Sequence, residues 1–146
     1  MIVVSDTTPL RHLIMIGRVD LLWMLYESVT VPTAVWKELQ AESTPAAVRT
    51  WLERAPDWLN IRSPRRPAPA NLALGTLDAG EREAIQLAIE LEADLLLMDD
   101  RDARALALRL LWQISKSVAS TCPLGCGRPP WNDIEVVTRR ACERRW

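Results

Sequence analysis

Six acidic side chains stand beside or between the apolar segments of this chain, where carboxylates could act together. They are Asp6, Glu38, Glu81, Glu83, Asp99 and Asp100. Carboxylates that converge repel one another, and a divalent cation between them relieves that repulsion. Mg²⁺ or Mn²⁺ held by carboxylates can promote the hydrolysis of a phosphodiester bond. Because the chain has one histidine and three cysteines, it offers few ligands for zinc or iron.

Most of these acids also have a purely structural interpretation. Acidic residues are common in the first turn of a helix, where the helix dipole favours them, and this could account for Glu81 and Glu83. Asp99 and Asp100 could cap a following helix. Asp6 is harder to explain in this way, because it follows a buried segment and Thr8 can already cap the next helix. Asp6 is therefore the strongest functional candidate.

The acids need a scaffold that brings them to one place. Apolar runs at residues 2–5, 29–31 and 94–98 predict buried strands, and residues 58–62 predict a short edge strand. Amphipathic segments predict helices over residues 8–16, 19–26, 33–41, 45–55, 78–92 and 101–111, with Trp23 and Trp36 in the core. This alternation favours an α/β fold with a parallel sheet. Ligands bind beyond the carboxyl ends of such strands, so the acids should meet at that edge.

Length and composition are those of one globular domain. The chain has 146 residues, of which 49% are hydrophobic and 25% charged, enough to bury its own core. No apolar run approaches the length of a membrane span. The start MIVVSDTTPL lacks the basic region of a signal peptide, so we expect a cytoplasmic protein. The net charge of −1 argues against a uniformly basic nucleic-acid coat.

Three segments, in this order, resemble the PIN-domain ribonucleases of the VapC-type toxin subgroup: MIVVSDTTPL, VTVPTAVWKEL and LDAGEREAIQLAIELEADLLLMDDRDAR. The resemblance covers about residues 1–110. It implies a PIN-like three-layer fold, with a central, mainly parallel sheet and helices on both faces. It also implies an endoribonuclease that uses Mg²⁺ or Mn²⁺ to cleave single-stranded RNA. As a toxin, such a protein would bind an antitoxin protein and form a homodimer.

The resemblance also implies which acids carry the reaction. The family's catalytic acids correspond to Asp6, Glu38, Glu83 and Asp99. Glu81 and Asp100 stand beside the last two and remain alternatives, so all six acids are candidate metal ligands. Thr7 matches a small hydroxyl residue beside the first acid.

The end of the chain departs from the family pattern. We divide the chain into a PIN-like domain at residues 1–111 and an atypical tail at residues 112–146. The tail is rich in Ser, Gly and Pro up to residue 132, which predicts irregular structure there, followed by a short amphipathic helix over residues 134–145. A frameshifted reading frame would explain the change, and loss of a strand would expose a sheet edge. The alternative function is a catalytically degenerate PIN-like protein that acts as a binding or dimerisation module.

Overall fold

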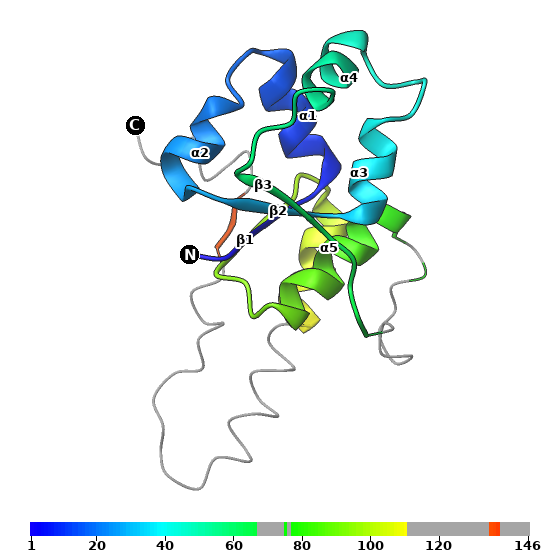
Figure 1. Cartoon of the computed structure of the whole chain (residues 1–146). Coiled ribbons are helices and arrows are strands. Elements are labelled where there is room, and N and C mark those ends of the chain that lie inside the picture. Colours follow the sequence, from blue (N-terminus) through cyan, green and yellow to red (C-terminus); the bar gives the residue numbers. More distant parts are fainter. Residues whose placement is uncertain (67–74, 76, 111–134, 138–146) are drawn as a thin grey trace, which may run out of the picture.

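The computed structural model describes residues 1–66, 75, 77–110 and 135–137 (Figure 1). Its strands are β1 (Val3–Ser5), β2 (Val29–Pro32), β3 (Leu59–Arg62), β4 (Leu95–Leu97) and β5 (Glu135–Val137). Its helices are α1 (Thr7–Met15), α2 (Asp20–Tyr26), α3 (Thr33–Leu39), α4 (Ala46–Leu52) and α5 (Ala79–Glu90). Residues 101–110 are also helical.

The strands form one parallel sheet in the order β3-β2-β1-β4-β5. The first strand of the chain therefore lies at its centre, where Val4 pairs with Thr30 on one side and with Leu96 on the other. All carboxyl ends point to the same edge, so the segments that follow β1, β2 and β4 are neighbours there. The predicted α/β fold with a parallel sheet is confirmed.

Two hydrophobic cores lie on opposite faces of the sheet, because successive residues of a strand point to opposite sides. Val3 belongs to the core beneath α1 to α4, and Val4 belongs to the core beneath α5 and the helix at 101–110. In Figure 1 the first group of helices lies above the sheet and the second group below it. The predicted helices on both faces are thus confirmed.

Three local predictions are wrong. The helix expected over residues 134–145 is contradicted at its start, because Glu135–Val137 form strand β5, which pairs with β4. The edge of β4 is therefore covered, and not exposed by a lost strand. Helix α1 begins at Thr7, so Asp6 and not Thr8 is its N-cap residue. The side chain of Trp23, expected in the core, is 54% exposed on α2.

The remaining expectations for the tail, the irregular segment at residues 112–132 among them, lie outside the described residues. Within the described part of the chain, no helix has both the length and the apolar character needed to cross a bilayer.

Candidate functional site

Asp6 stands at the junction of β1 and α1, beside the end of β4. Its backbone N–H donates to the carbonyl of Leu97 at 2.9 Å, which extends the pairing of β1 with β4 by one residue. Its φ of −80° and ψ of 173° are those of an N-cap residue, but its side chain makes no capping hydrogen bond to α1. The residue is only 4% exposed. Of the residues of α1, it is the backbone N–H of Thr7 that acts on this buried carboxylate.

Glu38 is held in a fixed position by two elements other than its own. It lies near the end of α3, and its Oε2 accepts a hydrogen bond from the Thr7 hydroxyl of α1 at 2.5 Å. Its Oε1 accepts from the backbone N–H of Gly80 in α5 at 3.2 Å. A Cβ atom on Gly80 would lie 2.9 Å from both carboxylate oxygens, closer than van der Waals contact allows. Any side chain at position 80 would therefore force the Glu38 carboxylate to move.

The start of α5 brings two further acids to this edge. Asp78 is the N-cap residue, and its Oδ1 accepts from the backbone N–H of Glu81 at 2.8 Å. The Oε2 atom of Glu81 in turn accepts from the backbone N–H of Asp78 at 3.2 Å. This is a capping box. Sequence reasoning left Asp78 out of the candidate site, although the D-x-x-E spacing in DAGE is a signal that could have identified it.

The acids share one electrostatic environment. Burial is the main cause that raises the pKa of Asp6 from 3.8 to about 7, and the negative charges of Asp78, Glu81 and Glu38 raise it further against the opposing backbone N–H of Thr7. The pKa of Glu81 is also raised, mainly by burial and then by the charges of Asp78, Asp100 and Glu38, against a backbone hydrogen bond in its cap. A cation at this edge would relieve the mutual repulsion.

We call Asp6, Glu38, Asp78 and Glu81 the acidic cluster. Asp100 borders it, because its charge acts on Glu81. The Oδ1 atom of Asp100 also accepts from the backbone N–H groups of Asp102 and Ala103, each at 2.8 Å, and so caps the helix at 101–110.

Two of the predicted catalytic acids have other surroundings. The Oε2 atom of Glu83 accepts from the backbone N–H of Ala34 at 2.9 Å, in the first turn of α3. The side chain of Glu83 thus provides an acceptor for a first-turn N–H group that has no partner within its own helix. Asp99 is exposed, and its backbone carbonyl accepts from Nη1 of Arg104 at 2.7 Å.

The carboxylates of the acidic cluster are ligands of the type that Mg²⁺ and Mn²⁺ prefer. Among the described residues, no group of three or more His, Cys, Asp or Glu side chains forms a ready-made cage. Mg²⁺ does not require one, since it keeps several waters and binds through one or two carboxylates together with substrate phosphates. The raised pKa of Asp6 beside Asp78, Glu81 and Glu38 shows a repulsion between carboxylates that such an ion would relieve.

The comparisons with known proteins give one match. Residues 2–117 match a family model described as a PIN domain, which spans β1 to β4 and the helix at 101–110. No curated protein and no solved structure matches the chain.

Proposed function

The chain belongs to the PIN-domain family, whose members are generally nucleases that use divalent metals, and from this premise we propose that it is a Mg²⁺- or Mn²⁺-dependent endoribonuclease of the VapC type. Its substrate is single-stranded RNA, and hydrolysis leaves a 5′-phosphate and a 3′-hydroxyl. The observation that carries the proposal is Asp6, a buried carboxyl whose pKa is raised to about 7 at the carboxyl edge of the sheet, next to three other acids.

In this proposal Asp6, Glu38 and Glu81 hold the metal, and Asp100 assists from the border of the acidic cluster. A divalent ion bound there supplies positive charge that stabilises the leaving oxygen. Thr7 and the N–H of Gly80 keep the Glu38 carboxylate in place, so that little is reorganised when substrate arrives. We prefer Glu81 to Glu83 because the charge of Glu81 acts on Asp6, whereas the Glu83 carboxylate accepts from Ala34 in the first turn of α3. Asp99 stays an alternative to Asp100.

We further propose that the protein acts as a cytoplasmic toxin with protein partners, an antitoxin and a second copy of the chain. Exposed large apolar residues on and beside α1 and α2 support this. They are Met15, Ile16, Leu21, Trp23, Met24 and Leu25. Exposed apolar surface, where it is contiguous, marks protein interfaces.

Cleavage of a labelled single-stranded RNA tests the function. We expect the wild-type chain to cut in Mn²⁺ or Mg²⁺, and to lose activity in EDTA and on Asp6→Asn. The matched control is Asp57→Asn, which removes the charge of an exposed aspartate before β3. If a wild-type chain that circular dichroism shows to be folded does not cut, the nuclease proposal fails, and the binding-module alternative takes its place.

A further inference from the structure

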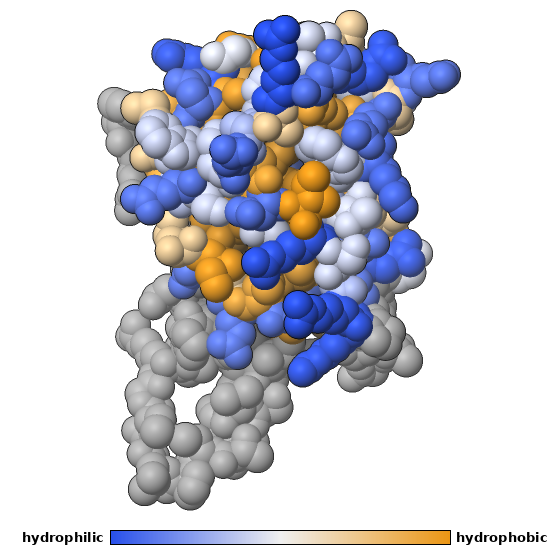
Figure 2. All heavy atoms as spheres, in the orientation of Figure 1, coloured by the Kyte–Doolittle hydropathy of each residue, from blue (hydrophilic) through white to orange (hydrophobic). Residues whose placement is uncertain are grey.

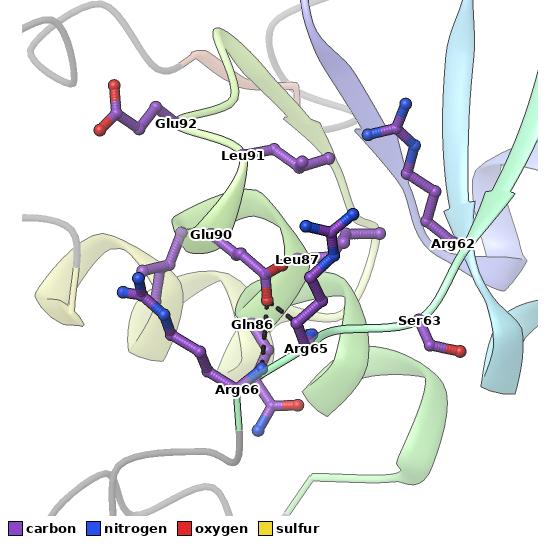
Figure 3. Close-up of a pocket in the computed structure, with 10 residues that line it drawn as sticks. Arg62, Ser63, Arg65, Arg66, Gln86, Leu87, Glu90, Leu91 and Glu92 are labelled. Atoms are coloured by element: carbon purple, nitrogen blue, oxygen red, sulfur yellow. Dashed lines mark hydrogen bonds between the residues drawn. The ribbon is translucent and has the colours of Figure 1, made fainter.

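A groove of about 1000 Å³ lies between the segment that follows β3 and the carboxyl half of α5 (Figure 3). Arg62, Arg65 and Arg66 line it together with Glu90 and Glu92, over a floor that includes Leu87. No residue of the acidic cluster lines it. Three arginines within five residues, on one wall of a groove, form a cationic surface that the proposed metal site does not use.

The backbone of this segment is fixed while its guanidinium groups stay accessible. The Oε2 atom of Glu90 accepts from the backbone N–H of Arg65 at 2.7 Å and from that of Arg66 at 3.3 Å. Figure 3 shows Arg62 and Arg65 extending toward the same side of the groove, near Leu91, and Arg66 extending past the other side of Glu90. Within the described residues, none of the three guanidinium groups pairs with a carboxylate.

The segment that carries the arginines starts at the edge of the sheet that carries the acidic cluster. The hydroxyl oxygens of Ser63 and Thr33 are 2.6 Å apart, which joins the start of the arginine segment to the start of α3. Glu38 lies five residues further along that helix, about 8 Å at the rise of an α-helix. In Figure 2 strongly hydrophilic side chains gather over the carboxyl end of β3 and the segment after it. A strand of RNA lying across α3 would therefore reach both places.

Electrostatics explains why a nuclease of this kind needs a second contact. The acidic cluster repels the phosphates of RNA, and phosphate contacts with Lys and Arg supply a large share of the affinity of proteins for nucleic acids. Guanidinium groups bind phosphate through paired N–H donors. We propose that Arg62, Arg65 and Arg66 form an RNA-backbone groove that binds phosphates to one side of the bond that is cut. The proposal rests on the proposed function, since it takes RNA as the substrate.

The test separates binding from cleavage. The triple variant Arg62→Gln, Arg65→Gln, Arg66→Gln is made in the full chain that also carries Asp6→Asn, and fluorescence anisotropy follows a labelled single-stranded RNA in EDTA. The matched control replaces Arg18, Arg49 and Arg54, three exposed arginines outside the groove, by Gln. Circular dichroism checks that all chains are folded.

Each phosphate contact to a single strand contributes about 0.7 to the slope of log affinity against log salt. Loss of three contacts should therefore make the slope shallower by about 2. The ratio of the affinities of the parent and the triple variant should then change roughly 20-fold between about 50 mM and 200 mM salt. The control triple variant should keep the slope of the parent.

If the groove variant keeps the slope of the parent, the proposed RNA-backbone groove is refuted. It is also refuted if the control triple variant loses as much slope as the groove variant, because this would show a general effect of charge. Inorganic phosphate that binds as tightly as the RNA would also overturn it, in favour of a single-anion site. On chains that keep Asp6, the groove variant should raise the KM for a long RNA about tenfold and leave kcat unchanged. Cleavage that depends on Asp6 supports the proposed nuclease function, whatever the groove variant shows. RNA binding that depends on the three arginines, without cleavage, supports the RNA-backbone groove but not the nuclease function.

Discussion

The charge of Asp6 should destabilise the folded chain when no cation is bound. The fold raises its pKa from the ordinary value of 3.8 to about 7, chiefly because the carboxyl is buried and then because of neighbouring acids. The folded state therefore holds the proton more tightly than the unfolded chain does. For an acid shifted in this direction, the stabilisation present at low pH is lost as the pH rises from about 4 to about 7. Asp6→Asn removes this titration.

The size of the effect follows from the shift. One pKa unit corresponds to about 1.4 kcal/mol, so a shift of about three units sets an upper limit of about 4 kcal/mol. Asn is close to Asp in shape and carries no charge. At pH 8 without metal, we expect Asp6→Asn to raise the free energy of unfolding by about 1–4 kcal/mol, and near pH 4 we expect little difference.

Urea unfolding in EDTA at several pH values measures this difference, with Asp57→Asn as the control for an exposed aspartate. Adding Mn²⁺ should then stabilise the wild-type chain and not Asp6→Asn, because a ligand stabilises the state that binds it. A wild-type chain that is as stable as Asp6→Asn at pH 8 without metal would refute the reasoning. It would mean that the buried carboxylate is stabilised by something other than a cation.

Two further predictions concern the neighbours of Asp6. Gly80→Ala should lower metal-dependent cleavage about tenfold, the equivalent of one lost hydrogen bond, because its Cβ would meet the Glu38 carboxylate at 2.9 Å. Its thermal unfolding midpoint should not fall by more than a few degrees, since Ala favours helix over Gly; a large fall would make Gly80 a folding residue and not a positioning one. In the same cleavage assay Glu81→Gln should lose activity at least tenfold, whereas Glu83→Gln should lose less, because an amide oxygen can still accept from Ala34. The reverse order would favour Glu83 as the metal ligand.

Much of the scaffold is predictable from the sequence because its signals are local. The apolar runs at residues 2–5, 29–31 and 94–98 coincide with β1, β2 and β4, and residues 58–62 coincide with β3. The order of the strands in the sheet depends on pairing between distant segments. Even so, the alternation of strands and helices along the chain already favours parallel strands whose carboxyl ends share one edge. For that reason Asp6 could be selected before any coordinates were known.

The rest depends on contacts between distant parts of the chain. The approach of Gly80 to Glu38 brings together α3 and α5, whose spacing no short motif encodes. The choice between Glu81 and Glu83 depends on which way each side chain leaves α5, and the position of α3 decides this for Glu83. Helical spacing also cannot reveal whether an apolar face such as that of Trp23 is covered by the chain itself or stays exposed.

The central position of β1 has a consequence for the time at which the protein becomes active during its own synthesis. The hydrogen bond from Asp6 to Leu97 joins residues about 90 positions apart. At about 5–20 residues per second, a ribosome needs roughly 5–20 s to reach Leu97 after it has made Asp6. Until then β1 has no β4 to pair with, and the acids of α5 are not in place. If the chain is the nuclease proposed above, a nascent chain therefore cannot cut RNA, even the message from which it is being translated, before most of its length has been made.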